Sequence, residues 1–389
     1  MEKHVLCLNS GSSSLKFALY RLGVSPGAVM HGAAKNIGQP QSSFSFETED
    51  TAVHKDLPIP THTHAVSKLL GALNLSPLPA PAACVHRIVH GGLALNQPVF
   101  ITDTIKNELE GVARLAPLHI PNELAVVEAA TRAFPKASQI ACFDTAFHHR
   151  MPEIAKRLPI PHVLRDEGVQ RYGFHGLSYE FVVAHLGTEL GKRSIIAHLG
   201  NGCSMVALRD GAPQDTTMGL TPTGGLMMGT RSGELDPGVL FYLLRRSAQN
   251  ERDSVGRVER MLNEESGLLG VSGRSRNMEE LLGLESSDSR AREAIDLFSY
   301  CAIKNIGSLC AVLSGIDTLV FTGGIGENAS AIRLRVCEGL GFLNIRIDPQ
   351  ANQTHNPILS RADSACAIRV IHTDENLMMA RHASALLAT

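Results

Sequence analysis

A strand-and-turn unit occurs twice in this chain, once in each half. An apolar run at 5–8 enters the polar turn 9–14, and a second apolar run at 194–199 enters the turn 200–204. Each turn is rich in Gly, Ser and Asn, and another apolar run follows it, which is the pattern of a β-hairpin. Two hairpins of the same design so far apart predict a duplicated α/β domain.

A third apolar strand, at 318–321, enters the Gly-rich segment 322–328, and here a helix pattern follows. Backbone N–H groups in such turns form concave anion sites, and small residues let phosphate oxygens approach the main chain. The stretch 324–329 also fits the dinucleotide fingerprint G-x-G-x-x-A. A dehydrogenase usually carries that fingerprint in its first strand–helix unit, so nicotinamide binding is the second hypothesis and phosphate binding the first.

Helical patterns alternate with these strands. They cover the ranges 121–134, 237–246, 289–313 and 375–387. Asp236 before Pro237 is a favourable N-cap, and Asp374 takes the same place before the last helix. Since 389 residues exceed one typical domain, the sequence predicts an α/β fold of two domains with mixed sheets.

Composition narrows the class of protein and its surroundings. The formal net charge is -2, and no dense Lys/Arg cluster occurs, so we expect neither nucleic-acid nor anionic-membrane binding. None of the eight cysteines forms a C-x-x-C pair, which indicates buried free thiols in a reducing compartment. The N-terminal apolar run is too short for a signal segment, and no apolar run is long enough for a membrane span. We therefore expect a cytoplasmic protein.

Arg87 is a candidate ligand for an anion. Alternation along the predicted strand 84–89 places it on one face between Val85 and Val89. An exposed arginine on an edge strand is the structural alternative. If the face is enclosed, Arg87 offers a guanidinium to a small carboxylate beside an apolar wall.

Other charged residues lie where active-site groups are common. Asp144 ends an apolar strand, although a cap of the next segment would explain it equally. Arg231 lies on a loop between two glycines, a position from which an arginine can reach into a cleft. Glu375 begins the last helix, where it could simply favour the helix dipole. Ser12, Ser14 and Lys16 add hydroxyl donors and a cation beside the first turn.

Two histidines are candidates for the site, and four are not. His119 and His175 both lie in turns that precede predicted helices. A lone histidine is more often structural than catalytic, and with 17 histidines most must be. We expect four others to be surface residues: His62, His64, His148 and His149.

Longer motifs occur in one order along the chain. They are 8–16, 86–92, 143–148, 172–176, 198–202, 228–233 and 373–378. With these motifs the chain resembles the acetate kinase family, in the fold group of sugar kinases, actin and heat-shock chaperones. The resemblance implies two duplicated actin-like, ribonuclease H-like domains with mixed sheets flanked by helices. It places them at 1–147 and 148–375, with the helix 376–389 packed back on the first domain.

The resemblance implies a phosphotransferase with a carboxylate acceptor. The reaction would be the reversible in-line transfer of the ATP γ-phosphoryl group to acetate, giving acetyl phosphate and ADP. Mg²⁺ is the implied metal, with Mn²⁺ as a substitute, and a homodimer through the C-terminal domain is the implied assembly. A propionate or butyrate kinase is the near alternative. The bulk of Val89 is the feature that would discriminate between acetate and these longer acids. A non-catalytic nucleotide-gated binding module is the more distant alternative, and it would not need Arg87, Arg231 and the two histidines His119 and His175.

The family also implies a role for each matching residue. Asn9 and Glu375 would serve the metal. Arg87 would bind the acetate carboxylate, with the apolar wall Val89, Leu118, Phe174 and Pro222. The implied catalytic residues are Asp144, His119, His175 and Arg231. The implied nucleotide contacts are Ser12, Ser14, Lys16, His198, Leu199, Gly200, Asn201, Gly202, Asn277, Met278, Glu279, Gly324, Ile325, Gly326, Glu327 and Asn328.

The implied chemistry needs no strong base. An acetate carboxylate is already ionised at neutral pH, so catalysis must come from positioning and from cations around the phosphoryl oxygens. Asp144 would then orient an arginine or metal-bound water rather than take up a proton.

One segment departs from the family pattern. After Gly-Val-Ser-Gly the family usually has Ser-x-Asp-x-Arg, whereas this chain has Asn277 in place of the acid and Glu279 in place of the base. In the family this segment lies at the nucleoside end. The departure therefore concerns nucleotide affinity and preference, and not the chemical step. The segment 222–225 also lacks an acidic residue that is often present there.

Overall fold

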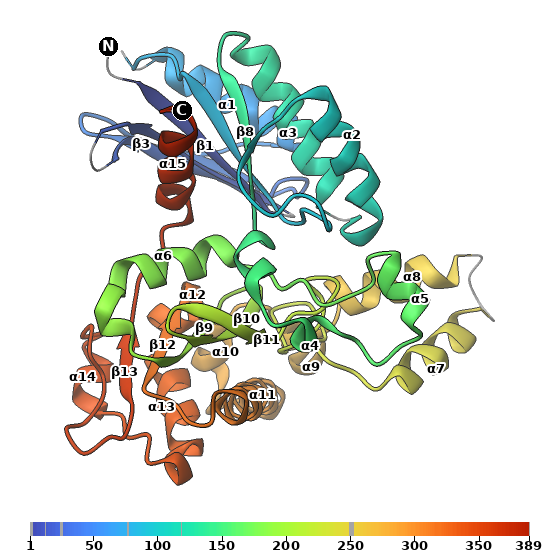
Figure 1. Ribbon diagram of the computed structural model, residues 1–389, viewed down its shortest axis with the longest axis vertical. Coiled ribbons are helices and arrows are strands. Elements are labelled where there is room, and N and C mark those ends of the chain that lie inside the picture. The colour runs from blue at the N-terminus through green and yellow to red at the C-terminus, as the bar shows by residue number, and fades with distance from the viewer. Residues whose placement is uncertain are drawn as a thin grey trace. The chain divides into compact units, whose positions relative to one another are not determined.

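The computed structural model describes residues 3–11, 13–23, 26–75, 78–117, 119–248 and 253–388. The chain divides into two compact units (Figure 1). The first unit consists of Met1–His149, Gly176–Phe181 and Asp374–Thr389, and the second of Arg150–His175 and Val182–Thr373. The assignment of 176–181 to the first unit was not predicted.

The first unit is built on an eight-stranded sheet in the order β5-β4-β3-β2-β1-β6-β8-β7. The strands are β1 (His4–Gly11), β2 (Ser14–Arg21), β3 (Gly27–Lys35), β4 (Ser43–Thr48), β5 (Ala52–Asp56), β6 (Ala83–Ile88), β7 (Val99–Phe100) and β8 (Ser138–Phe143). Strand β1 runs antiparallel to β2 and parallel to β6, which in turn runs parallel to β8. The short edge strand β7 is antiparallel to β8.

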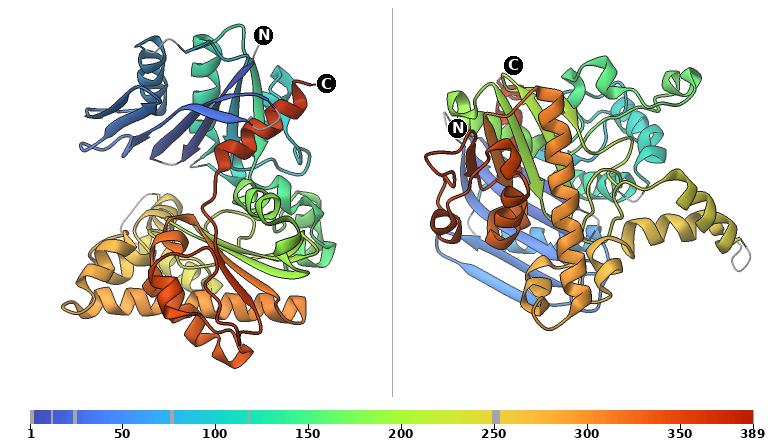
Figure 2. Two further views of the ribbon diagram at one scale, coloured as in Figure 1. Left: turned by 90° about the vertical axis from the view of Figure 1, so that its left-hand side faces the viewer. Right: turned by 90° about the horizontal axis from the view of Figure 1, so that it is seen from below.

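Helices cover both faces of the central strands in this unit. The helices are α1 (His62–Leu75), α2 (Asp103–Val112), α3 (Ile120–Ala133) and α15 (Glu375–Leu386), with 3-10 turns at Ala113–Leu115 and Ala146–Arg150. Figures 1 and 2 show α1 and α3 on one face of the sheet and α15 across the other. Because β1 is covered on both sides, its residues 5–8 form an unbroken apolar run of buried side chains rather than an alternating one.

The second unit holds a five-stranded sheet in the order β11-β10-β9-β12-β13. Its strands are β9 (Arg193–Leu199), β10 (Cys203–Arg209), β11 (Ala212–Thr216), β12 (Thr318–Thr322) and β13 (Ala367–Val370). Its helices are α4 (Glu153–Lys156), α5 (His162–Asp166), α7 (Pro237–Ser247), α8 (Ser254–Glu264), α9 (Gly267–Ser272), α10 (Met278–Leu284), α11 (Ser289–Leu313), α12 (Gly323–Asn328), α13 (Ser330–Gly339) and α14 (Pro349–Gln353), with 3-10 turns at Gly187–Leu190 and Gly341–Leu343. Helix α6 (Gly176–Leu186) begins in the first unit and ends in the second.

The two sheets share one plan, which confirms the predicted duplication. In both, an antiparallel hairpin carries a third antiparallel strand on one side, and two parallel strands follow on the other side. The common order is β3-β2-β1-β6-β8 in the first unit and β11-β10-β9-β12-β13 in the second. The fold is α/β with mixed sheets flanked by helices, as predicted.

Helix α11 is the core helix of the second unit. Within the described residues it is the one helix long and apolar enough to cross a membrane by length and composition. Its apolar stripe, which includes Ile295, Phe298 and Ile306, is buried, and the helix packs against β9, β10 and β11 (Figure 2). A buried stripe of this kind is typical of a helix that covers a sheet.

Candidate active site

Arg87 is held at the centre of the first sheet. It lies on β6, between β1 and β8, so the alternative of an exposed edge-strand arginine is wrong. Its Nε donates to Asp144 Oδ1 at 2.9 Å, its Nη2 donates to Asp144 Oδ2, and its Nη1 donates to Asn9 Oδ1 at 3.2 Å. Asp144 is fully buried. This bidentate pair fixes the plane of the guanidinium.

The charges in this cluster are mutually compensated. Burial acts to lower the pKa of Arg87, but Asp144 and Glu375 outweigh it and raise that pKa above its usual range. Arg87 therefore stays cationic. Since both Asp144 oxygens accept guanidinium N–H bonds, Asp144 fixes the orientation of the arginine side chain.

Asn9 and Glu375, the two residues predicted to serve a metal, contact each other in the first unit. Asn9 Nδ2 donates to Glu375 Oε2 at 2.6 Å. Among the described residues, no group of three or more His, Cys, Asp or Glu side chains could hold a metal ion. Two oxygen-bearing side chains are nevertheless a fitting donor set for Mg²⁺, which keeps several waters and takes phosphate oxygens as its other ligands.

The turn after β9 and the turn after β12 pack closely in the second unit. Gly200 N–H donates to the Gly202 carbonyl at 3.1 Å. A Cβ on Gly323 would lie 2.8 Å from the Leu199 carbonyl oxygen and 3.1 Å from His198 Nε2. Gly323 also has a φ of 76°, so both its conformation and its surroundings require glycine. The small residues thus let the main chains of the two turns approach each other closely.

His175 and Arg231 lie against the first of these turns. The His175 ring stacks on His198 with centroids 4.2 Å apart, and its Nδ1 forms a hydrogen bond of 2.8 Å with Ser204 Oγ. A Cβ on Gly202 would lie 3.3 Å from His175 Nε2 and 3.5 Å from Arg231 Nη1. The structure thus gathers three predicted site residues around one Gly-rich turn.

His175 has a backbone conformation that few side chains adopt. Its φ is 58°, and it occupies the N-cap position of α6. Left-handed residues other than glycine persist where their surroundings hold them. Here the bond to Ser204 and the stacked His198 do so. We interpret the conformation as part of the positioning of this imidazole.

The predicted apolar wall is divided between the two units. Val89 is 3% exposed in the first unit, and Phe174 is 1% exposed in the second. Pro222 is also buried, and its carbonyl accepts a hydrogen bond of 3.1 Å from Arg231 Nη1. Leu118 and the predicted nucleotide residue Ser12 lie outside the described residues.

Glu327 supports the second turn through its carboxylate. It is buried, and it accepts hydrogen bonds from Thr322 Oγ1 at 3.2 Å, from Gly323 N–H at 2.9 Å and from Thr373 N–H at 3.1 Å. It also forms an ion pair with His372. The contacts of this carboxylate hold the turn in shape, while direct contact of Glu327 with nucleotide stays a prediction.

The other predicted nucleotide residues differ in exposure. Those that are exposed are Lys16, Asn201, Asn277, Glu279, Gly324 and Asn328, whereas Leu199, Met278, Ile325 and Gly326 are buried and Ser14 is intermediate. Asn277 is the N-cap of α10, and its Oδ1 accepts the Glu279 N–H at 2.9 Å. A Cβ on Gly229 would lie 3.3 Å from the Arg276 carbonyl and 3.4 Å from Asn201 Oδ1. The segment that differs from the family pattern therefore lies beside the first Gly-rich turn of this unit.

Residues 4–381 match the model of the acetokinase family. The chain belongs to this family. It is 44% identical over 396 residues to the acetate kinase of Rhodopseudomonas palustris (strain TIE-1), with 98% of each chain covered.

Solved structures of the same family agree with the fold. The crystal structure of Porphyromonas gingivalis acetate kinase has a TM-score of 0.85 at 35% identity and covers 99% of this chain and 100% of that one. A propionate kinase from Francisella tularensis has a TM-score of 0.90 at 36% identity, with 98% of each chain covered. The acetokinase fold thus extends over nearly the whole chain.

Two of the four histidines expected on the surface of this acetokinase chain are buried, so the prediction for them was wrong. His62 opens α1, and its Nε2 forms a hydrogen bond of 2.8 Å with the Gly11 carbonyl. His148 packs edge-on against Phe147 and Tyr179. Both errors arise because a polar residue beside a turn gives no sign of the neighbours that tertiary structure brings to it.

One charged residue near Arg87 was not predicted at all. Glu123, on α3, is 3% exposed and accepts the Val89 N–H at 3.1 Å. The sequence does not distinguish a buried acid in the first turn of a helix from an exposed one that favours the helix dipole.

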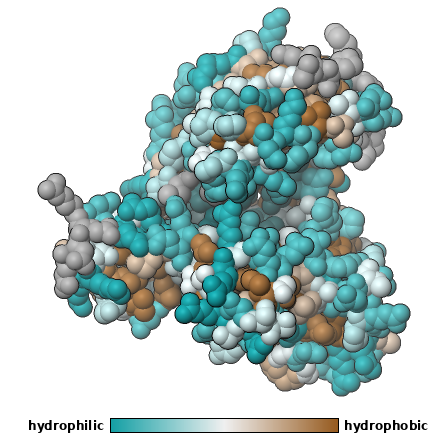
Figure 3. Space-filling view, turned by 180° about the vertical axis from the view of Figure 1, so that it is seen from behind, coloured by the Kyte–Doolittle hydropathy of each residue, from teal (hydrophilic) through white to brown (hydrophobic). Residues whose placement is uncertain are grey.

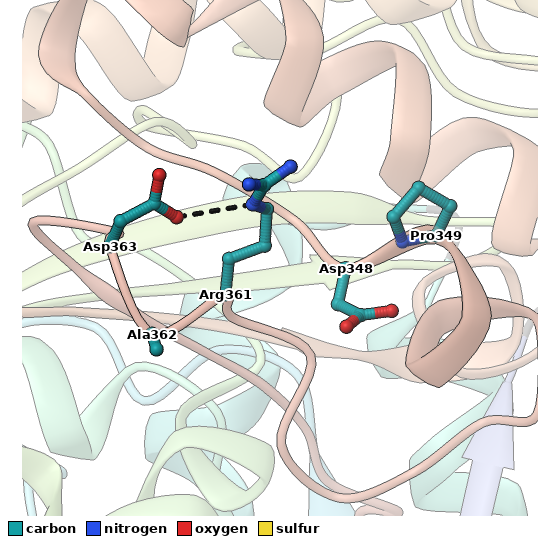
Figure 4. Close-up of a pocket in the computed structure, with 5 residues that line it drawn as sticks. All are labelled: Asp348, Pro349, Arg361, Ala362 and Asp363. Carbon is teal, nitrogen blue, oxygen red and sulfur yellow. Dashed lines mark hydrogen bonds and ion pairs between the residues drawn. The ribbon is translucent and has the colours of Figure 1, made fainter.

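A separate pocket of about 390 Å³ lies in the second unit, near α14 (Figure 4). It is lined by Asp348, Pro349, Arg361, Ala362 and Asp363. The Arg361 Nε donates to Asp363 Oδ1 at 3.1 Å, so the positive charge is already compensated. None of the predicted site residues lines this pocket.

Proposed function

We infer that the protein is an acetate kinase, which transfers the γ-phosphoryl group of ATP to the carboxylate of acetate and gives acetyl phosphate and ADP. Membership of the acetokinase family over residues 4–381 supports this function. The observation that carries it is Arg87, a largely enclosed cation fixed by Asp144 and Asn9, two residues before the buried Val89.

The first unit contributes the groups suited to acetate. The Arg87 guanidinium presents donors in a fixed plane, and a carboxylate can be recognised by such a fork. Val89 adds an apolar surface for the methyl group. Because acetate is ionised at neutral pH, Asp144 does not need to remove a proton, and it keeps Arg87 in position instead.

The second unit contributes groups suited to the nucleotide phosphates. The backbone of 200–202 and 323–324 forms the phosphate cradle, and His175, His198 and Arg231 lie at the first of these turns. Transfer of a phosphoryl group spreads negative charge over its three equatorial oxygens, so a cation and imidazoles aimed at it act in the transition state. His119, the N-cap of α3 in the first unit, is a further imidazole proposed for the reaction.

The divalent metal is Mg²⁺ in this proposal, and Mn²⁺ can replace it because both accept oxygen ligands. Asn9 and Glu375 would hold the metal directly or through water. When bound, Mg²⁺ neutralises the charge of the nucleotide phosphates. The amide of Asn9 presents its oxygen to Arg87 and its nitrogen to Glu375, so binding through this amide oxygen would require the side chain to turn.

Propionate is the second candidate substrate. A similar solved structure is a propionate kinase, and one added methylene changes discrimination by only about 1–3 kcal/mol. A coupled assay of ADP formation with acetate, propionate and butyrate tests the assignment. Preference for acetate would support the proposal, and turnover with none of the three acids would contradict it.

We propose that the protein acts as a homodimer in the cytoplasm. Helix α7 has no buried residue in the described chain, and it projects with α8 from the rest of its unit (Figure 1). Its exposed apolar side chains are Val239, Phe241 and Tyr242, and Figure 3 shows apolar atoms on this projecting pair of helices. A second copy would cover such a patch.

The homodimer can be tested by light scattering after gel filtration. Phe241→Asp should give monomers if α7 forms the interface. Exposed Ile154, on α4, provides the matched variant Ile154→Asp, which should stay dimeric. A monomeric wild-type protein would contradict the proposal.

A further inference from the structure

Glu123 is a buried carboxyl group that has no part in the function proposed above. It lies in the first turn of α3 and is 3% exposed. Its two carboxyl oxygens lie 3.1 and 3.3 Å from the Val89 nitrogen, whose N–H donates to them. Val89 follows β6 directly, two residues after Arg87. Glu123 therefore holds the chain at the point where the predicted acetate groups lie.

The charges around Glu123 come from two strands. Arg87 on β6 attracts the ionised carboxyl, and Asp144 beyond β8 repels it. On its own helix, His119 lies one turn earlier, and its carbonyl accepts the Glu123 N–H at 3.0 Å. The Arg87 guanidinium is in turn acted on by three carboxyl groups, those of Asp144, Glu375 and Glu123.

The carboxyl changes its charge near neutral pH. Burial raises the pKa of Glu123 to about 8, because the loss of water outweighs the attraction of Arg87 and the hydrogen bond from Val89. An exposed glutamate ionises near pH 4. At neutral pH Glu123 is thus mainly neutral, and Asp144 is the principal counter-charge of Arg87.

We propose that Glu123 is a positioning residue for acetate, which holds Val89 beside Arg87 and weakens the binding of the anion when its own carboxyl ionises. The inference rests on the proposed function, because it concerns the acid substrate. An ionised Glu123 adds a second buried carboxylate beside Arg87. That charge competes for the guanidinium and repels an incoming anion.

The linkage has a definite sign. Acetate adds negative charge near Glu123, so it favours the protonated form and raises the pKa of this carboxyl further. Acetate binding should therefore take up protons around pH 8. The acetate KM should be constant at lower pH, rise between the two pKa values, and level off above them. A difference of one pKa unit corresponds to a tenfold rise.

Glu123→Gln separates charge from shape. The amide keeps the size of the side chain and an oxygen that can accept the Val89 N–H, but it cannot ionise. Between about pH 7 and about pH 10, the acetate KM of the wild-type protein should rise about tenfold for a difference of one pKa unit, while the acetate KM of the variant stays flat. Glu128→Gln, an exposed acid on the same helix, should keep the wild-type profile.

Proton uptake gives a second measurement. Calorimetric titration of acetate in two buffers of different ionisation enthalpy should show uptake by the wild-type protein near pH 8 and none by Glu123→Gln. The same KM profile in both proteins would overturn the inference, and so would a wild-type protein that takes up no protons. If Glu123→Gln does not fold, the proton uptake of the wild-type protein on acetate binding is sufficient to test the inference. Absence of acetate-dependent turnover at every pH would instead overturn the proposed function.

Discussion

Glu327 accepts a hydrogen bond from the backbone N–H of Thr373 at 3.1 Å, although the two residues lie 46 positions apart. The same carboxylate accepts the Gly323 N–H at 2.9 Å, at the start of α12. One buried acid thus holds the Gly-rich turn and the chain segment that continues into Glu375. The Glu327 carboxylate therefore stabilises both the turn that is proposed to bind phosphate and the segment that precedes Glu375, the proposed metal residue.

Removal of this support should reduce both stability and nucleotide binding. Glu327→Ala leaves the buried donors of Thr322 and Gly323 and the partly buried N–H of Thr373 without their acceptor, at a cost of about 1–3 kcal/mol for a buried group. We expect a lower free energy of unfolding in urea and a higher ATP KM. Glu338→Ala, an exposed acid on α13, is the control. A variant with wild-type stability would contradict this account.

Arg231→Ala should act mainly on kcat. An arginine aimed at the transferring phosphoryl group acts in the transition state, and its loss is expected to cost on the order of 10³-fold or more. The acetate KM should change much less. Steady-state kinetics at saturating ATP separate the two constants, and an unchanged kcat would remove Arg231 from the reaction.

Arg87→Ala should show a large increase in the acetate KM, because this guanidinium is the proposed partner of the carboxylate. The change also leaves Asp144 buried without its ion-pair partner, which is commonly worth about 3–5 kcal/mol of stability. The folded fraction must therefore be measured by circular dichroism alongside the kinetics. A folded Arg87→Ala protein with a wild-type acetate KM would show that acetate binds elsewhere.

Local structure was predictable because its causes are local. The range 289–313 was predicted as a helix, and α11 spans Ser289–Leu313, since Asp288 caps its start and a regular apolar stripe runs along it. The hairpin β9–β10 was predicted from an apolar run and a Gly-rich turn. In these cases the residues that decide the conformation are close neighbours in sequence.

Contacts between distant segments were harder to predict from the sequence. Alternation indicates which side chains share a face, but it does not show that β6 lies between β1 and β8, which is what encloses Arg87. The burial of His148 and Glu123 depends on packing from other segments, and no local pattern records it. The family resemblance supplied residue roles at the site that spacing alone could not.

Val89→Ala should improve propionate relative to acetate. Val89 is buried beside the proposed acetate ligand Arg87, and its smaller replacement leaves room for one more methylene, worth about 1–3 kcal/mol of discrimination. The ratio of kcat/KM for the two acids is the measurement. Val126→Ala, which removes the same atoms from a buried position on α3, controls for lost stability. An unchanged preference would mean that Val89 does not face the acyl group.

The segment at the start of α10 should determine nucleotide affinity. Asn277 caps this helix and is exposed, and Glu279 is exposed in its first turn. An aspartate at 277 would keep the cap and add charge to any hydrogen bond with a ribose hydroxyl, while an arginine at 279 would reverse the local sign near the nucleotide. The wild-type chain should therefore have a relatively high ATP KM and modest discrimination between ATP and GTP.

Asn277→Asp combined with Glu279→Arg should lower the ATP KM by a few fold, equivalent to about 1 kcal/mol at a partly exposed site. The acetate KM and kcat should change little, because the groups around Arg87 and Arg231 are untouched. Asn277→Asp alone separates the ribose effect from the effect of the reversed charge. Initial rates with ATP and GTP at saturating acetate give the comparison. If the double variant leaves the ATP KM as it was, or damages acetate binding instead, this segment does not lie at the nucleoside end.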